Sequence, residues 1–196
     1  MKKLLITGFD PFGGQTVNPA WEAVSRLPDR IGSYALTRCR IPTAFGRAPQ
    51  AVLNAALDAQ PDVILCIGQA GGRRALTPEM VAINLRHASI PDNDGNRPQD
   101  QPVAADGPAA YFATVPVRAM AQAAEAAGVG AAVSYSAGTF VCNDTLYTLL
   151  HRYRGTAVRV GFVHVPFLPR QAENGQPSMA LEDMVRGLTA MIESLS

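Results

Sequence analysis

Residues 63–67, Val-Ile-Leu-Cys-Ile, constrain the fold more than any other part of the chain, because all five are apolar. A strand with one face in water alternates apolar and polar residues, whereas a strand buried on both faces is continuously apolar. The segment therefore predicts a central strand of a sheet that has helices on both faces. The glycine-rich turn at residues 68–72 follows it directly and would end the strand.

Short apolar runs and helical patterns alternate along the rest of the chain, which is typical of the α/β class. The strands expected from these runs are residues 4–7, 34–41, 63–67, 80–85, 132–135 and 158–163. The expected helices are residues 19–27 (with Asn18 as N-cap), 48–59, 117–127, 142–151 and 181–195. Residues 90–109 are polar and rich in Pro, Asp and Asn, so we expect a long irregular segment there.

The length of 196 residues favours one domain spanning residues 1–196, since a domain has roughly 150 residues. Lys and Arg number 17 and Asp and Glu number 16, which leaves a formal net charge of +1. A nucleic-acid-binding domain usually carries a basic excess on one face, so this balance argues against nucleic acid as a partner.

Neither export nor membrane insertion is expected. The apolar run near the N-terminus stops after residues 4–6, whereas a signal peptide needs roughly 7–15 apolar residues. No stretch approaches the ~20 apolar residues of a membrane span. The three cysteines form no C-x-x-C pair, which argues against a disulfide framework or a zinc site. We therefore expect a metal-free protein in a reducing, cytoplasmic compartment.

Glycine-rich turns follow expected strands at residues 8–14, 68–72 and 137–139. Ligands bind at the carboxyl ends of strands in open α/β sheets, so these turns could line one site. None has the spacing of a Walker A or dinucleotide-binding loop. Simple βα turns are an equally good interpretation of the three segments.

Cys142 follows the third of these turns, at the expected start of a helix. A thiol there lies close to unpaired N–H groups and to the positive end of the helix dipole, which lower its pKa. The same N–H groups can bind a developing oxyanion. Cys66 lies among Ile and Leu and is expected in the core. Cys39 lies on an alternating strand, where a structural role is expected.

A cysteine nucleophile also needs a base and a group that orients the base. His164 lies at the end of the expected strand 158–163, where ligand-binding groups of α/β sheets occur. His87 is expected in a loop and His151 at the polar end of a helix. Glu79 is the carboxylate candidate, although its local sequence by itself predicts a solvated loop residue.

The acidic run at residues 92–96 does not fit a calcium loop. With its glycine at position 6 of an EF-hand, Ile90 would be at position 1 and Gln101 at position 12, where acidic ligands are needed. We therefore interpret the run as an Asn- and Asp-rich turn.

Several motifs together point to a family. They are GFDPFGGQTVNPAWEAV at residues 8–24, IGQAGGR at 67–73, TPEMVAINL at 77–85, IPDNDGNRP at 90–98, SAGTFVCN at 136–143 and GFVHVPFLP at 161–169. They extend over most of the chain in the expected order. The chain thus resembles the pyroglutamyl peptidase I family, also called pyrrolidone-carboxylate peptidases, which are cysteine peptidases.

The resemblance implies removal of an N-terminal pyroglutamyl residue from peptides, without a cofactor. It implies Cys142 as the nucleophile, acting through its thiolate and an acyl-enzyme, His164 as the general base and Glu79 as the carboxylate that orients the histidine. It also implies a single three-layer α/β/α domain with a mixed, mostly parallel sheet. Bacterial members assemble as homotetramers, so the resemblance implies a homotetramer here.

The resemblance also implies a substrate pocket with apolar walls, a polar residue beside the lactam and backbone contacts. The matching residues are Phe9, Phe12, Phe140 and Ile90 for the walls, Gln69 for the polar residue and Val141 for the backbone groups. A slot between Phe rings suits the flat, uncharged pyroglutamyl lactam, and a few amide groups can bind its C=O and N–H. A free N-terminal amine would lose its hydration there without a partner, which favours specificity by exclusion.

One position departs from the family. The residue before Ile-Pro-Asp-Asn is usually Arg in relatives, an electrostatic helper near the reacting carbonyl, whereas here it is Ser89. A cation would then come from Arg73, Arg74 or Arg86, or would be absent. Two alternative functions stay open: a binder of pyroglutamyl peptides that does not cleave them, and a phosphate-dependent nucleoside enzyme of similar architecture.

Overall fold

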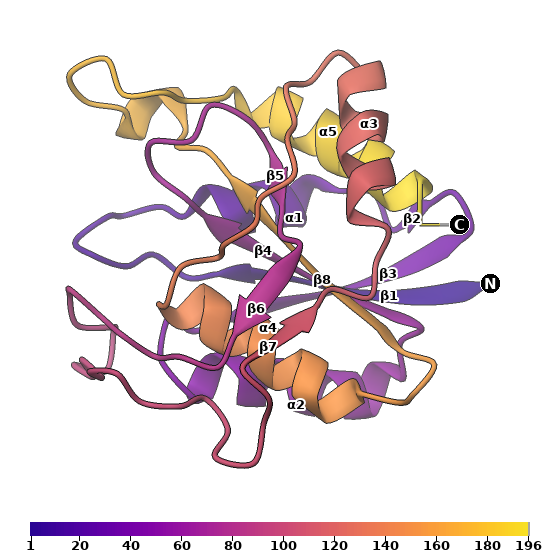
Figure 1. Ribbon diagram of the computed structural model, residues 1–196. Coiled ribbons are helices and arrows are strands. Elements are labelled where there is room, and N and C mark those ends of the chain that lie inside the picture. The colour runs from indigo at the N-terminus through magenta and orange to yellow at the C-terminus, as the bar shows by residue number, and fades with distance from the viewer. Residues whose placement is uncertain (196) are drawn as a thin grey trace.

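The computed structural model describes residues 1–195 and is built around a six-stranded sheet with the order β2-β3-β1-β4-β8-β5 (Figure 1). These strands are β1 Lys2–Phe9, β2 Arg30–Ile31, β3 Tyr34–Ile41, β4 Val63–Gln69, β5 Thr77–Pro78 and β8 Arg159–Val165. The neighbours β3, β1, β4 and β8 are parallel, whereas β2 and β5 pair antiparallel at the two edges. The prediction of a mixed, mostly parallel sheet is confirmed.

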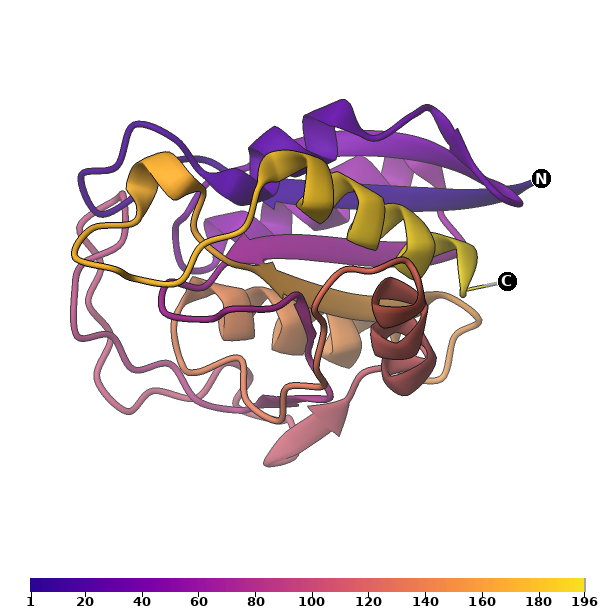
Figure 2. The same cartoon turned by 90° about the horizontal axis from the view of Figure 1, so that it is seen from above.

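Helices cover both faces of this sheet. One apolar core includes α1 Pro19–Arg26, α3 Val117–Ala126 and α5 Leu181–Glu193, and the other includes α2 Arg47–Ala59 and α4 Val141–Tyr153. In Figure 1, α3 and α5 lie above the strands and α2 and α4 below them. Figure 2, seen from above, shows the yellow α5 lying across the strands. The predicted α/β class with three layers is confirmed.

The central strand is β4, as its apolar run predicted. Val63, Leu65 and Ile67 contribute to the core under α1, α3 and α5. Ile64 and Cys66 point the other way, into the core under α2 and α4. All five are 0% exposed. Burial on both faces is the reason why this strand lacks polar alternation.

Two expected strands differ in the structure. Residues 132–135 form no regular strand. Backbone hydrogen bonds do join residues 130–134 to residues 76–80, but the pairing consists of two isolated parallel bridges, at Ala131 and Ser134. Residues 80–85 shorten to β6 Val81–Ile83, which pairs with β7 Ala110–Phe112 in a separate two-stranded sheet. The sequence analysis missed β2, β5 and β7, since strands of two or three residues are too short to show a period.

The other predicted strands and all five helices are present, with ends that lie within two residues of those expected. The side chain of Asn18 caps α1 by accepting a hydrogen bond from Ala20 N at 3.0 Å. The short 3₁₀ helix η1, Pro169–Gln171, follows β8. Residues 84–109 connect β6 to β7 without a helix or strand, as predicted for most of this segment. Within residues 1–195 no helix is long and apolar enough to cross a bilayer.

Gly8 allows α1 to approach the carboxyl end of β1. A Cβ atom at this position would lie 2.7 Å from Trp21 Cα and 2.8 Å from Trp21 N. These are backbone atoms, so a side-chain rotation cannot relieve the contact, and the helix itself would have to move.

We predict that Gly8→Ala lowers the free energy of unfolding by about 1–3 kcal/mol, because it overpacks the contact between β1 and α1. Gly130→Ala is the matched control, since its added Cβ would meet only Ala75 Cβ at 3.9 Å. Urea unfolding followed by circular dichroism measures both variants. Equal midpoints for the two would contradict this account of the packing.

Candidate active site

A cavity of about 360 Å³ lies at the edge where β1, β4 and β8 end and α4 begins. This is the edge at which ligands bind in open α/β sheets. Six of the nine residues predicted for the site line the cavity: Phe9, Phe12, Gln69, Phe140, Cys142 and His164. The three glycine-rich turns also contribute to its lining, so their convergence on one place is confirmed.

Cys142 is the second residue of α4 and therefore lies at a helix N-terminus, as predicted. No side chain caps this terminus, which leaves the first N–H groups of the helix without a cap. Asn143 fixes the first turn of α4 against β6. Its Oδ1 accepts from Ile83 N at 2.9 Å, and its Nδ2 donates to Ile83 O at 2.9 Å and to Leu85 O at 3.0 Å.

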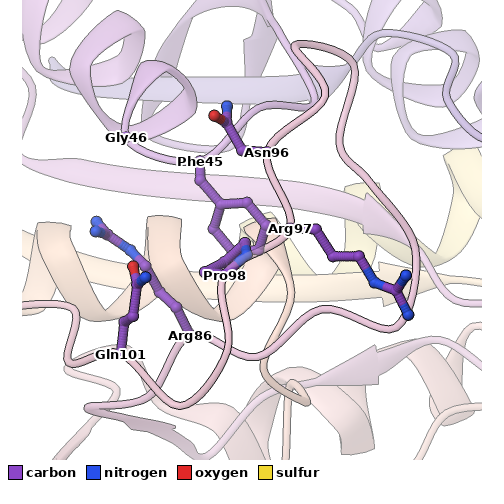
Figure 3. A pocket seen from close by; sticks show the side chains of 7 residues that line it. All are labelled: Phe45, Gly46, Arg86, Asn96, Arg97, Pro98 and Gln101. Atoms are coloured by element: carbon purple, nitrogen blue, oxygen red, sulfur yellow. The ribbon is translucent and has the colours of Figure 1, made fainter.

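Asp144 anchors the same turn to other segments. Its Oδ2 accepts from Gly46 N at 2.8 Å, and its Oδ1 lies 2.7 Å from Arg86 Nε. Arg86 lines a second cavity, of about 380 Å³, together with Arg97 and other polar residues (Figure 3). Arg86 is therefore paired with Asp144 and does not line the cavity that contains Cys142.

His164 and Glu79 form a buried pair at the cavity. β5 lies antiparallel to β8, and Glu79 directly follows β5. His164 Nδ1 lies 2.7 Å from Glu79 Oε1, and the two residues are 4% and 0% exposed. An ionised carboxylate only accepts hydrogen bonds, so Nδ1 carries the proton and Nε2 is left as the basic atom. The expectation of a solvated Glu79 is wrong, because the pairing of β5 with β8 carries this residue inward.

Arg73 shares the same carboxylate. Its Nη1 donates to Glu79 Oε1 at 2.7 Å and also hydrogen-bonds Thr77 Oγ1, and its Nη2 donates to Ser136 O at 3.1 Å. Burial raises the pKa of the Glu79 carboxyl, but the hydrogen bonds from His164 and Arg73 contribute to an opposing effect that lowers it overall. Glu79 is therefore ionised at neutral pH.

The three arginines considered as replacements for a cation at Ser89 lie in different places. Arg73 lines the cavity together with Cys142. Arg74 is exposed and Arg86 pairs with Asp144, so neither lines it. Ser89 itself is exposed and lies outside the lining.

Burial sets the protonation of the cysteine and the histidine. It raises the pKa of the Cys142 thiol to about 12, and the charge of Glu79 adds to this rise while Arg73 opposes it. The prediction that the helix N-terminus lowers this pKa is wrong, because burial has the larger effect. Burial also lowers the pKa of His164 below its ordinary value, although the hydrogen bond to Glu79 opposes this. At neutral pH the two groups are therefore a thiol and a neutral imidazole.

Aromatic rings form the apolar part of the cavity. The ring centroids of Phe12 and Phe140 lie 6.1 Å apart, and Phe45 contacts Phe140 edge-on at 5.2 Å. Phe9 is 2% exposed and lies 6.1 Å from the ring of Phe162. Each cavity ring is thus supported by another ring.

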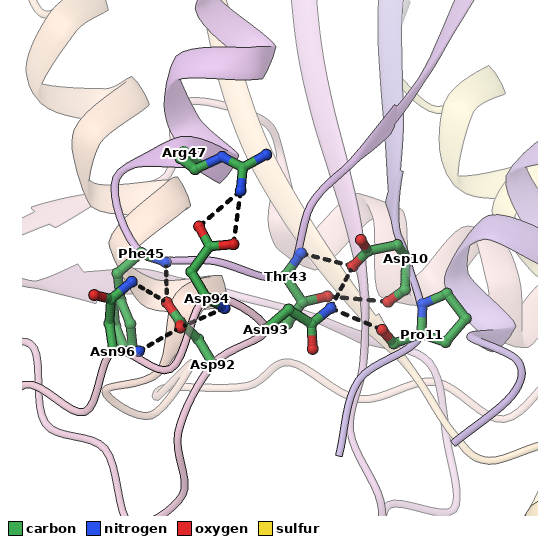
Figure 4. A network of polar contacts seen from close by, with 9 residues as sticks. All are labelled: Asp10, Pro11, Thr43, Phe45, Arg47, Asp92, Asn93, Asp94 and Asn96. Atoms are coloured by element: carbon green, nitrogen blue, oxygen red, sulfur yellow. Dashed lines mark hydrogen bonds and ion pairs between the residues drawn. The ribbon is translucent and has the colours of Figure 1, made fainter. Parts of the chain in front are cut away.

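The Asp-rich turn holds the loop that carries Phe45 (Figure 4). Asp92 is 5% exposed, and its Oδ2 accepts from Phe45 N at 2.8 Å. Its Oδ1 accepts from Asp94 N at 2.9 Å and from Asn96 N at 2.7 Å. The interpretation of this run as a turn is confirmed, and its buried carboxylate also bridges to a second loop.

Asp10 and Asn93 extend this network to the loop that carries Phe12. Asn93 Nδ2 donates to Pro11 O at 2.9 Å and to Asp10 Oδ1 at 3.2 Å. Thr43 N donates to the same Asp10 oxygen at 2.7 Å (Figure 4). Three loops that are distant in sequence are therefore joined beside the cavity.

Two of the residues matched to the family's pocket do not line the cavity. Ile90 is 46% exposed, and Val141 is fully buried in the core under α2 and α4. Asn18 and Thr43 do line it, although sequence analysis gave neither a role in the site. Asn18 was already explained as a helix cap, and Thr43 lies in no motif that indicates a ligand.

The remaining histidines lie outside the cavity. His87 Nδ1 is 2.9 Å from Asp100 Oδ1, and His151 Nδ1 is 2.9 Å from Tyr111 Oη. Within residues 1–195 no three His, Cys, Asp or Glu side chains are grouped so that they could hold a metal ion.

Comparison with known proteins relates the chain to one family over its full length. The profile of the family described as "Pyroglutamyl peptidase" matches residues 2–196. A pyrrolidone-carboxylate peptidase of Levilactobacillus brevis is 52% identical, covering 98% of this chain and 97% of its own. One of Escherichia fergusonii is 51% identical, covering 100% of this chain and 94% of its own.

Solved structures give the same result. The crystal structure of pyroglutamyl peptidase I from Bacillus amyloliquefaciens matches with a TM-score of 0.96 and 43% identity, covering 100% of this chain and 97% of its own. The pyrrolidone carboxyl peptidase from Thermococcus litoralis matches with a TM-score of 0.93 and 35% identity, covering 100% and 93%. The chain therefore belongs to the pyroglutamyl peptidase family of cysteine peptidases.

Proposed function

We propose that this protein removes N-terminal pyroglutamyl residues from peptides by covalent catalysis at Cys142. The observation that carries the proposal is the shared cavity, in which Cys142 and His164 meet a wall of phenylalanine rings, while the buried Glu79 hydrogen-bonds His164. Nucleophile, base and orienting carboxylate are the parts that acyl transfer by a thiol requires. The wall of aromatic rings suits a small, flat and uncharged substrate residue, and the polar side chains beside it, such as Gln69, can bind the polar edge of that residue.

In the proposed mechanism, His164 Nε2 takes the proton of the Cys142 thiol as sulfur attacks the carbonyl carbon of the pyroglutamyl residue. The uncapped N–H groups at the start of α4 stabilise the oxyanion. His164 then gives the proton to the leaving amine, and the acyl-enzyme forms. Water, deprotonated by the same imidazole, attacks the thioester carbonyl; the C–S bond breaks, the imidazolium returns its proton to the sulfur of Cys142, and pyroglutamate is released. Glu79 keeps Nδ1 protonated throughout, which leaves Nε2 free to act.

Protonation states support general-base activation of a thiol. The raised pKa of Cys142 and the lowered pKa of His164 disfavour a resting thiolate–imidazolium pair. Within residues 1–195 no hydrogen bond joins Cys142 Sγ to His164. Such bonds are often loose before substrate binds and tighten in the complex.

The two alternatives have less support. A nucleoside enzyme would need a phosphate-binding loop, and the family relationship does not favour one. A pyroglutamyl-peptide binder without activity would be expected to lack part of the triad, whereas Cys142, His164 and Glu79 are all present. A homotetrameric assembly and a cytoplasmic location stay predictions from the resemblance and from the cysteine pattern.

We predict that Cys142→Ala lowers kcat on a chromogenic pyroglutamyl amide by on the order of 10⁴ or more, because no acyl-enzyme can form. Iodoacetamide should inactivate the unmodified enzyme in the same assay. Cys39→Ser is the control and should keep its activity, since Cys39 lies outside the cavity. Substantial turnover by Cys142→Ala would overturn the proposed function.

We predict that His164→Ala loses nearly as much kcat as Cys142→Ala, and that Glu79→Gln loses less. The base and the nucleophile act as a unit, whereas the carboxylate orients the imidazole and stabilises the imidazolium. Steady-state kinetics of the two variants on the same amide give the comparison. A Glu79→Gln variant as inactive as His164→Ala would contradict the orienting role.

We predict that Arg73→Met moves the acid limb of the kcat/KM pH profile to higher pH. The charge of Arg73 lowers the pKa values of both Cys142 and His164, so its removal raises both. Activity on the acid side should fall roughly tenfold for each pH unit that the limb moves.

Arg73→Lys is the matched control for this prediction, because it keeps the positive charge but loses the forked geometry. Its acid limb should stay closer to that of the unmodified enzyme. If the acid limb of the pH profile is unchanged in Arg73→Met, the charge of Arg73 has no effect on the pKa values of Cys142 and His164.

A further inference from the structure

Gln171, the last residue of η1, lies outside the lining of the cavity and makes contact with the cavity-lining Gln69. It is 8% exposed, so its amide must find its partners within the protein. Its Oε1 accepts from Leu168 N at 3.0 Å, and its Nε2 lies 3.3 Å from Val17 O and 3.1 Å from Gln69 Oε1.

The backbone partners fix the orientation of the Gln171 amide. Leu168 N–H can only donate and Val17 C=O can only accept, so the oxygen of Gln171 must face Leu168 and its NH₂ must face Val17. The same NH₂ group then donates to Gln69, which requires Gln69 to turn its oxygen toward Gln171. The NH₂ group of Gln69 is left over, and no hydrogen bond within residues 1–195 occupies it.

We propose that Gln171 is a specificity-determining residue, which holds Gln69 so that it presents only hydrogen-bond donors to the cavity. The inference rests on the proposed function and deepens it. An unrestrained glutamine presents either its C=O or its NH₂ group, and thus accepts ligands of both kinds. With its oxygen engaged, Gln69 selects a ligand that offers a carbonyl, as the pyroglutamyl lactam does.

This arrangement discriminates against an N-terminal proline. The prolyl ring has the same size as the lactam but lacks the ring carbonyl and carries a protonated amine, which has only donors. Donors of Gln69 would face donors of the ligand, and buried N–H groups would be left unpaired. Gln171 acts through Gln69 and is expected to touch no substrate atom.

Three variants test the proposal. Gln171→Met removes both polar groups and frees the Gln69 amide. Gln171→Glu, assayed at pH 8, offers only hydrogen-bond acceptors to Gln69. The NH₂ group of Gln69 then turns toward residue 171 and away from the cavity. The oxygen of Gln69 therefore faces the lactam carbonyl, which it repels. Gln69→Leu removes the group through which Gln171 acts. Gln122→Glu on α3, outside the cavity lining, controls for the added charge.

The readouts are kcat and KM on pyroglutamyl and prolyl arylamides. Calorimetric binding of pyroglutamyl-alanine to the same variants in a Cys142→Ala background gives a measure that needs no turnover. We expect about a tenfold loss of pyroglutamyl kcat/KM and affinity for Gln171→Met, and about 10²-fold for Gln171→Glu. KM should carry most of the loss, and discrimination against the prolyl amide should weaken. Gln122→Glu should behave as the unmodified enzyme.

A double-mutant cycle separates this role from a structural one. In the Gln69→Leu background, Gln171→Met should cause no further loss, because the two residues act through one hydrogen bond. The proposal would be overturned if Gln171→Met lowered kcat/KM equally in the Gln69 and Gln69→Leu backgrounds. It would also be overturned if neither Gln171 variant changed the affinity for the lactam.

Failure of the proposed function has a different signature. If the unmodified enzyme cleaves no pyroglutamyl amide while the Cys142→Ala chain binds the lactam in a Gln171-dependent way, only the catalytic assignment is wrong. If that chain binds no lactam at all, the proposal about Gln171 is wrong as well.

Discussion

The Glu79 carboxylate is a buried negative charge, and its pairing with His164 and Arg73 is the interaction on which the site depends. A carboxylate that is 0% exposed stays ionised only where charge and hydrogen bonds replace its hydration. Both Nη1 of Arg73 and Nδ1 of His164 lie 2.7 Å from the same oxygen. This geometry fixes the imidazole tautomer and brings a permanent cation next to the cavity.

The other side chains of the cavity depend on polar anchors that lie outside it. Asn143 ties the first turn of α4 to β6, and Asp92 ties the turn at residues 92–96 to the loop of Phe45. Each anchor joins segments that are far apart in sequence, so loops without regular structure are tied to the rest of the fold. Gln171 continues this pattern, because it orients Gln69 from outside the cavity lining by means of two backbone groups.

Local sequence predicted those site residues whose positions are set by the helix or strand in which they lie. Cys142 at a helix start and His164 at a strand end follow from the order of apolar runs and turns. Glu79 could not be placed in this way, because its burial comes from the pairing of β5 with β8, and a two-residue strand leaves no period in the sequence. The strand predicted at residues 132–135 is replaced by two isolated bridges, although this segment hydrogen-bonds residues 76–80 through its backbone. Local alternation does not show whether such pairing is regular.

The sequence by itself determined the α/β class, the central position of β4 and the family, since continuous apolar runs, helical periodicity and motifs are local properties of the chain. Only the tertiary structure decided which charges are buried together. Of Arg73, Arg74 and Arg86, only Arg73 lines the cavity in the structure. The hydrogen bond from Gln171 also sets the orientation of the Gln69 amide. The physical reason is that ion pairs and hydrogen bonds depend on distances of a few ångströms between residues that lie 85 to 154 positions apart, which no local pattern encodes.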